Sequence, residues 1–270
     1  MRPECRSAAG TFGLALPRGV LAGRAGERLG RGTGSSLEFM DFRDYTPGDD
    51  LRHVDWRTYA RTDQLKVRLF REEVSPNLDI IADLSASMAV TERKEQALRD
   101  LVEAAAFWAS RWGCRPRRLS CGGEVFEDGD AVPLSGAADG DLLPREALRP
   151  RGLRLLISDF LFRDDPAPML RKLASGAAHL YVIQLLDPWE WEPVREGTIT
   201  LRDCETGDRL DLELDPRTID AYRRRLDVLT GSVRRAMHGV GGSYGAVRAD
   251  HPLAMFRRDL LPAGMVEAVA

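Results

Sequence analysis

The sequence predicts an α/β protein with an open, mostly parallel central sheet that helices flank on both faces. Apolar runs typical of buried strands occupy 77–83, 153–158 and 179–186. Stretches with the helical spacing of apolar residues alternate with these runs, and such alternation favours parallel strands joined by helices. In sheets of this kind, ligands bind beyond the carboxyl ends of the strands. The three runs end in or just before Asp83, Asp159 and Asp187.

Local signals predict the other elements. Apolar residues from Leu98 to Trp112 recur at helical spacing, which indicates a helix over 91–112. Asp215 followed by Pro216 marks the start of a second long helix, because aspartate caps helices and proline fits their first position. The remaining expected elements are a strand at 118–121, a hairpin turning at Asp128 and Gly129, a hairpin over 198–214, a strand over 243–249 and a helix over 251–261.

The chain divides into three predicted regions. Residues 1–35 hold the run GRAGERLGRGTGSS, which buries little apolar surface and predicts a flexible Gly- and Arg-rich arm. Residues 36–74 are dense in acids, arginines and aromatic residues and end in the alternating pattern of a half-buried strand. We expect them to add a β-rich segment that packs on the core. Residues 75–270 form the main domain, with a β-hairpin insertion at about 195–214.

Composition excludes several classes of function. Of the 270 residues, 43% are hydrophobic and 30% are charged, which is typical of a globular protein. The net charge of −3 and the pI near 5.9 give no basic field, so we expect no nucleic-acid partner. No run approaches the length of a membrane span, so no membrane insertion is expected. The four cysteines lack the spacing of a zinc site or a disulfide framework, which favours the cytoplasm.

One stretch, LDIIADLSASM, places a carboxylate and two hydroxyls directly after a buried strand. Asp83, Ser85 and Ser87 have the spacing D-x-S-x-S. Their oxygens suit a hard divalent cation such as Mg²⁺, which keeps several waters and needs few protein ligands. The alternative is that they cap the following helix, since such residues satisfy free backbone N–H groups. Asp159, at the end of another apolar run, favours the metal interpretation and completes the predicted ligand set.

These motifs carry a resemblance to known families. DLSASM after LDIIA, with LLISDF downstream, resembles the metal-ion-dependent adhesion site of von Willebrand factor type A domains. The wider pattern includes EFMDFRDYTPGDDLRHVDWRTYAR, LLDPWEWEPVREGTITLRDCETGDRL and the closing helix. Over roughly residues 30–262 this pattern resembles the family catalogued as domain of unknown function 58.

The resemblance implies a von Willebrand factor A-like, Rossmann-like fold with strand order 3-2-1-4-5-6. The strands that carry Asp83 and Asp159 would then be neighbours. It also implies Mg²⁺ as the cofactor, held by the four ligands named above. The middle loop of such sites offers a threonine, but no threonine occurs between Thr91 and Thr198. The expected site is therefore degenerate, or it takes a substitute ligand from Ser135, Asp139 or Asp141.

The same resemblance implies a function and partners. Members of the family are typically encoded beside MoxR-type AAA+ ATPases. The expected function is therefore a non-enzymatic adaptor that works with such an ATPase in the assembly or activation of an acidic client protein. Trp189 and Trp191 alternate in DPWEWEP, so we expect one to be buried and the other to be exposed as a partner contact.

The block before the first strand offers a second acid cluster. Asp49, Asp50, His53 and Asp55 are interpreted as structural, because acids after a turn often cap a helix and buried acids usually pair with arginines, of which this block has several. Trp56 and Tyr59 are expected to pack on the core. The alternative function is a metal-dependent hydrolase that uses the strand-end aspartates with Asp49 and His53. The sequence has no HExxH motif and no nucleophile elbow to support it.

Overall fold

The computed structural model of the chain contains two compact units, which are described separately. The main unit comprises Met1–Ala15 and Pro76–Ala270, and the small unit comprises Leu16–Ser75. The described residues are 1–16, 37–46, 54–72, 77–121, 125–126, 143–144, 147–162, 164–193, 197–204 and 206–269. The predicted turn at Asp128 and Gly129 lies outside them.

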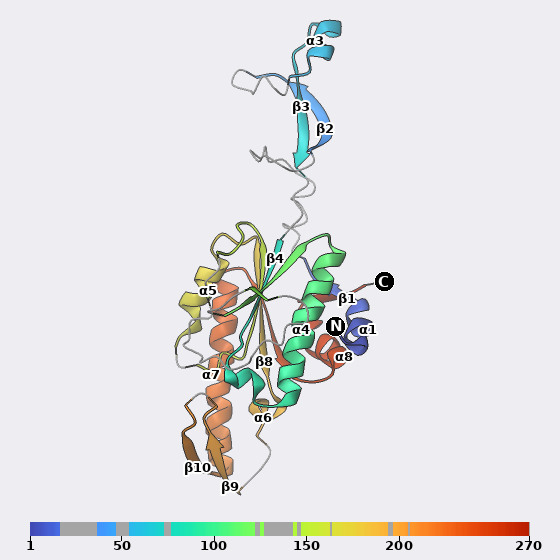
Figure 1. The fold of residues 1–270 in the computed structure, drawn as a ribbon. Helices are drawn as coiled ribbons and strands as arrows, with labels where there is room; N and C mark the ends of the chain where they lie inside the picture. Colours follow the sequence, from blue (N-terminus) through green and yellow to red (C-terminus); the bar gives the residue numbers. More distant parts are fainter. Residues whose placement is uncertain are drawn as a thin grey trace. The chain divides into compact units, whose positions relative to one another are not determined.

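A six-stranded sheet forms the centre of the main unit, and five of its strands are parallel (Figure 1). In spatial order the strands are β11 (Ser243–Arg248), β8 (His179–Leu186), β7 (Leu153–Ser158), β4 (Asn77–Ala82), β5 (Arg115–Ser120) and β6 (Val125–Phe126). The short strand β6 runs antiparallel to β5. Numbered along the chain and read from the β6 side, the order is 3-2-1-4-5-6. The predicted α/β class with a mostly parallel sheet is confirmed.

Helices cover both faces of this sheet (Figure 1). One face carries α4 (Glu92–Arg111), with α1 (Pro3–Gly10), α8 (Pro252–Ala254) and the π-helix η3 (Met255–Leu260) beside it, and the other carries α5 (Pro166–Ala174) and α7 (Pro216–Gly239). Every residue of β7 is buried, as expected for a parallel strand between two helical layers. Within the described ranges, no helix is both long enough and apolar enough to cross a membrane.

The first fifteen residues differ from the predicted flexible arm. They form α1 and β1 (Phe12–Leu14), and β1 pairs antiparallel with β12 (Val266–Ala268) near the other end of the chain. Phe12 is buried and meets the ring of Phe256 edge to face. The short apolar segment around Phe12 buries enough surface to join the core, and the glycine- and arginine-rich composition of the whole region concealed it. Residues 17–36 lie outside the described part of the chain.

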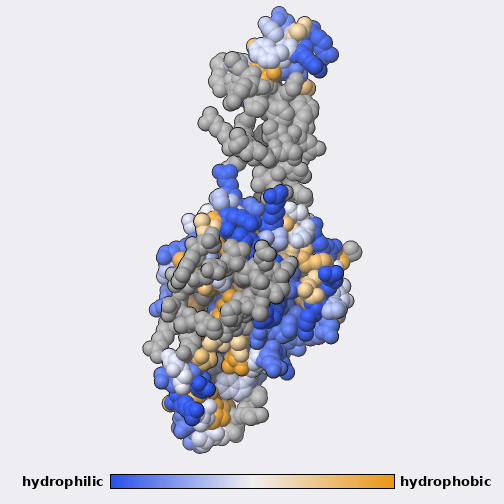
Figure 2. Space-filling model, in the orientation of Figure 1, coloured by the Kyte–Doolittle hydropathy of each residue, from blue (hydrophilic) through white to orange (hydrophobic). Residues whose placement is uncertain are grey.

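A two-stranded hairpin, β9 (Gly197–Arg202) and β10 (Arg209–Leu214), lies where the sequence predicts one. Leu201 lies opposite Leu210, so these apolar side chains share one face of the hairpin. Leu210 is 59% exposed. The hairpin and the first turns of α7 lie at the lower end of the main unit in Figure 1, together with α6 (Pro188–Trp191). Figure 2 shows some hydrophobic residues at this end, mixed with hydrophilic ones.

The described residues of the small unit form a hairpin and a short helix. β2 (Leu37–Asp44) pairs antiparallel with β3 (Lys66–Glu72), and α3 (Trp56–Thr62) lies between them in the chain. Asp55 caps α3, because its Oδ1 accepts a hydrogen bond of 3.0 Å from the Arg57 N–H in the first turn. For this acid, the structural interpretation is confirmed.

Two aromatic residues of α3 are not buried within the small unit. Trp56 is 56% exposed and Tyr59 is 39% exposed, and their rings contact each other edge to face. The helix buries none of its seven residues. That both rings pack on the core stays a prediction. Asp49, Asp50 and His53 lie outside the described residues. That residues 36–74 pack on the main domain stays a prediction.

Candidate functional site

Asp83 and Asp159 lie at the carboxyl ends of neighbouring strands. β4 and β7 pair in parallel, and the Asp83 N–H continues the ladder by donating to the Ile157 carbonyl at 2.9 Å. Each aspartate is only 2% exposed. The structure therefore brings these two predicted residues together at one edge of the sheet.

Asp83 is held by groups from both strand ends. Its Oδ1 accepts a hydrogen bond of 3.0 Å from the Ser85 N–H, and its Oδ2 accepts one of 2.7 Å from the Ser158 hydroxyl. The hydroxyls of Ser85 and Ser87 lie 3.0 Å apart. Burial and the nearby charge of Asp159 raise the pKa of Asp83 above its ordinary value. All four predicted ligands therefore lie around one buried strand end.

The alternative role of these residues as caps of the long helix α4 is wrong. Thr91 is the N-cap of α4, and its hydroxyl oxygen accepts a hydrogen bond of 3.1 Å from the Lys94 N–H. Ser85 precedes the short 3-10 helix η2 (Ala86–Ala89) and makes no side-chain capping bond to it. The two serine hydroxyls are not needed to begin either helix.

A strained turn fixes Asp159. Phe160, the next residue, is fully buried and has a φ of 59°, in the left-handed region that bulky residues rarely adopt. The Phe160 N–H donates to the Ser158 hydroxyl at 3.0 Å, and the Leu161 N–H donates to Asp159 Oδ1 at 2.9 Å. Such a conformation costs on the order of 1–3 kcal/mol and is typical of functional sites, where surrounding contacts enforce it.

Lys94 is a member of this site that the sequence analysis missed. Its side chain is completely buried, and Nζ lies 2.8 Å from Asp159 Oδ2 and 2.8 Å from Glu190 Oε1. Burial alone would lower the pKa of Lys94, but the charges of Asp159 and Glu190 outweigh it and raise that pKa. A buried ammonium therefore links two carboxylates from different strand ends. In the sequence, a single lysine on a polar helical turn gives no sign of these distant partners.

Both predicted partner-binding tryptophans are exposed, at 38% for Trp189 and 36% for Trp191. The expectation that one of them is buried is wrong. It assumed strand-like alternation, whereas these residues form the short helix α6, which turns Glu190 inward between them. Glu190 closes a capping box, because its Oε2 accepts a hydrogen bond of 2.7 Å from the Asp187 N–H.

The donors at the strand ends fit a hard divalent cation in type and in charge. They are carboxylate and hydroxyl oxygens, which Mg²⁺ prefers. The buried carboxylates of Asp83, Asp159 and Glu190 outnumber the ammonium of Lys94 by three to one, so a cation would offset an excess of negative charge. Among the described residues, no three His, Cys, Asp or Glu side chains form a ready metal cluster. The substitute ligands Ser135, Asp139 and Asp141 lie outside the described ranges.

A family model described as "Protein of unknown function DUF58" matches residues 41–120 and 134–230. These segments make up well over half of the chain and contain every predicted site residue. The chain belongs to the DUF58 family. This confirms the family resemblance drawn from the sequence motifs.

The DUF58 chain is similar to proteins that are themselves uncharacterized. Uncharacterized protein Rv1480 of Mycobacterium tuberculosis and uncharacterized protein Mb1516 of Mycobacterium bovis are each 28% identical, over 92% of this chain and 86% of the relative. The crystal structure of conserved hypothetical protein BatB from Bacteroides thetaiotaomicron covers 62% of this chain and 98% of that one, with 11% identity and a TM-score of 0.28. That score is too low to indicate a shared fold.

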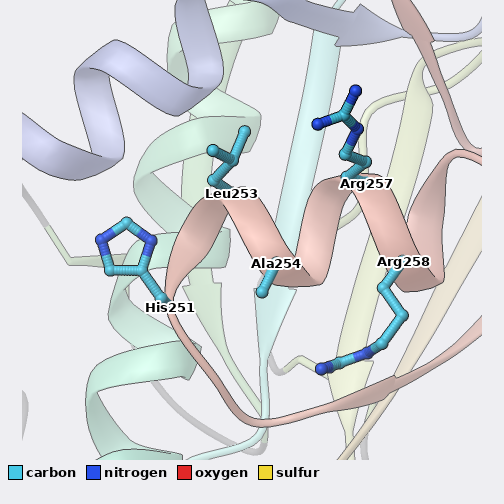
Figure 3. A pocket seen from close by; sticks show the side chains of 5 residues that line it. All are labelled: His251, Leu253, Ala254, Arg257 and Arg258. Carbon is cyan, nitrogen blue, oxygen red and sulfur yellow. The ribbon is translucent and has the colours of Figure 1, made fainter.

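The DUF58 chain also has a surface pocket of about 380 Å³ after the end of β11 (Figure 3). It is lined by His251, Leu253, Ala254, Arg257 and Arg258. Arg258 is bound by Asp250 and Asp259, and His251 Nε2 lies 3.2 Å from a Glu4 carboxylate oxygen. Because internal acids already engage these two side chains, we assign no ligand to this pocket.

Proposed function

We propose that the chain is a non-enzymatic interaction protein whose sheet edge binds Mg²⁺ through Asp83, Ser85, Ser87 and Asp159. The observation that carries this proposal is the excess of buried carboxylates beside two serine hydroxyls at the strand ends. Burial of two neighbouring ionised acids is unfavourable, and a cation between them would compensate it, because Lys94 contacts only one of the two.

The fold supports a von Willebrand factor A-like form of this site. The strand order 3-2-1-4-5-6 is the one that the family resemblance implies, and it makes the strands of Asp83 and Asp159 neighbours. The exposed hydrophobic residues Val90, Leu161 and Trp189 each follow one of the adjacent strands β4, β7 and β8. A bound Mg²⁺ would supply positive charge and a free coordination position for a carboxylate of a partner.

On this proposal, the partners are a MoxR-type AAA+ ATPase and an acidic client protein in the cytoplasm. The client would place a carboxylate at the ion and apolar groups against the surrounding surface. Trp189 and Trp191 suit this contact, because large aromatic side chains that stand at the edge of a polar site are typical anchors of protein interfaces.

Calorimetric titration with Mg²⁺ tests the ion site directly. We expect saturable binding to the wild type, loss of binding in Asp83→Ala, and unchanged binding in Asp164→Ala. Asp164 is a matched control, because it is an exposed aspartate on the loop that follows Asp159. Equal heats for the three proteins would exclude a specific site at the strand ends.

A pull-down with the purified MoxR-type ATPase and its client tests the adaptor role. The immobilised chain should retain these two proteins only when Mg²⁺ is present. Their retention should be lost with EDTA and in Asp83→Ala, but not in Asp164→Ala. Equal retention under all conditions would mean that the strand-end site is structural. The partner-binding surface would then be expected in the small unit.

One observation also supports the alternative of a metal-dependent hydrolase. A buried acid with a raised pKa beside a second acid is typical of catalytic sites, and Asp83 has this environment. A screen of phosphate and peptide substrates with Mg²⁺ or Mn²⁺ decides between the two functions. Turnover that Asp83→Ala abolishes would favour the hydrolase over the adaptor.

A further inference from the structure

A buried ionic link joins Asp159 to Glu190, the residue between the two exposed tryptophans. Lys94 lies in the first turn of α4, a helix of 20 residues whose buried face anchors it on the sheet. From there its ammonium reaches Asp159 and Glu190, at 2.8 Å each. Glu190 belongs to α6, between Trp189 and Trp191. One side chain thus contacts both the proposed ion site and the proposed partner contact.

The helix α6 depends on such links for its position. It has four residues, and isolated helices shorter than about 12–15 residues are marginal in water. Side chains therefore hold it in place. The Tyr222 hydroxyl donates to the Glu190 carbonyl, and the Thr91 hydroxyl donates to Asp187 Oδ2 at 2.6 Å. The contact with Lys94 is the one that leads on to Asp159.

The carboxylate that Lys94 holds also begins the helix. Glu190 Oε2 accepts from the Asp187 N–H at 2.7 Å, while Oε1 accepts from Lys94. A shift of the ammonium therefore changes the side chain that completes the capping box. Trp189 and Trp191 flank Glu190 directly, so a shift of this buried side chain disturbs the turn that carries them.

We infer that Lys94 is a positioning residue that couples Asp159 to α6, so that a cation bound beside Asp159 changes the placement of Trp189 and Trp191. A cation at the strand ends competes with Lys94 for the charge of Asp159 and repels the ammonium toward Glu190. Ion binding and the partner-binding surface are then linked. The cation-driven part of this inference rests on the proposed function, whereas the coupling between Asp159 and α6 does not.

Hydrogen exchange in metal-free protein tests the coupling by itself. Glu190→Gln should raise the exchange rates of the amides in 187–192 by about tenfold, because it replaces a charged hydrogen bond with a neutral one. Asp159→Asn should change the rates of the same amides, although this residue is not part of α6. Glu192→Gln is the matched control, since Glu192 pairs at 2.8 Å with Arg223 on the exposed surface. In Glu192→Gln, the exchange rates of the amides in 187–192 should stay within about twofold of the wild type.

Exchange rates in α6 that are unchanged in Asp159→Asn would overturn the coupling, because Glu190 closes the capping box itself and its substitution disturbs α6 in any case. Circular dichroism of each variant confirms that it is folded. If Asp159→Asn does not fold, Lys94→Met decides instead, because it removes the link between Asp159 and Glu190 and leaves both carboxylates in place.

Titration with Mg²⁺ alone tests the cation-driven part, with calorimetry for binding and tryptophan emission for α6. The double variant Trp189→Phe/Trp191→Phe assigns the emission change to α6. In the wild type we expect binding together with an emission change. Glu190→Gln, titrated to saturation with its own Kd taken from calorimetry, should bind Mg²⁺ without the emission change, because its link from Lys94 to α6 is weakened.

The outcomes separate this inference from the proposed function. Binding of Mg²⁺ by the wild type without any response of α6 would overturn the inference and leave the ion site standing. Absence of binding would refute the ion site and the cation-driven part together. The exchange experiment would then still decide whether Lys94 couples Asp159 to α6.

Discussion

Lys94→Met tests how strongly the buried ammonium stabilises the main unit. Methionine resembles lysine in length and carries no charge, so the substitution retains most of the packing of this fully buried side chain. It leaves the carboxylates of Asp159 and Glu190 without their shared cation. Breaking a buried ion pair by removing one partner costs about 3–5 kcal/mol. In a unit of roughly 200 residues, this loss lowers Tm by about 6–20 °C.

Urea and thermal unfolding in EDTA, followed by circular dichroism, measure this loss. Lys172→Met is the matched control, because Lys172 is exposed and its replacement should change the free energy of unfolding by less than about 0.5 kcal/mol. Adding Glu190→Gln to Lys94→Met should restore part of the loss, since one of the two unpaired charges is then removed. A loss below about 1 kcal/mol in Lys94→Met would refute the reasoning, because it would mean that the carboxylates do not need the ammonium.

Three other residues of the main unit give further tests. Phe12→Ala should lower the free energy of unfolding by about 3 kcal/mol in urea titrations, and a loss under about 1 kcal/mol would mean that β1 contributes little to the core. Trp189→Ala should leave the free energy of unfolding within about 1 kcal/mol of the wild type but weaken retention of the client by about tenfold, and equal retention would place the client contact elsewhere. Burial lowers the pKa of His179, so its contribution to stability is present above its unfolded pKa of about 6.5 and is lost as the pH falls. The urea midpoint should therefore drop between about pH 7.5 and 5, and by less in His179→Gln; equal drops would assign the effect to other groups.

The central elements of the fold were predictable because their signals are local. The run LRLLIS coincides with β7, and α7 begins at Pro216 after the Asp215 cap. In both cases, burial or capping acts over a few adjacent residues. The strands β1 and β12 were not predictable in this way. Each has three residues, and each becomes a strand because it pairs with the other from the opposite end of the chain.

In the candidate site, too, residues with local signals were predictable and residues whose contacts join distant segments were not. Asp83, Ser85 and Ser87 share one motif, and Asp159 follows a clear apolar run, so the sequence identifies all four. Lys94 and Glu190 were missed because their contact joins residues 96 positions apart. Trp191 was assigned to an alternating pattern, whereas the capping box at Asp187 makes this segment a helical turn. A capping aspartate followed by Pro188 was the local signal that would have indicated this turn.

Stability alone does not account for the ionic link among Asp159, Lys94 and Glu190. Replacing a buried ionic group by apolar residues of similar volume is often neutral or stabilising, because desolvation of the charges offsets much of their attraction. The same edge of the sheet also holds the buried Asp83 and a left-handed Phe160, and both are unfavourable features for stability. Three costly features next to one another, with exposed tryptophans attached to the same network, are better explained by a binding site whose geometry has to be maintained or changed.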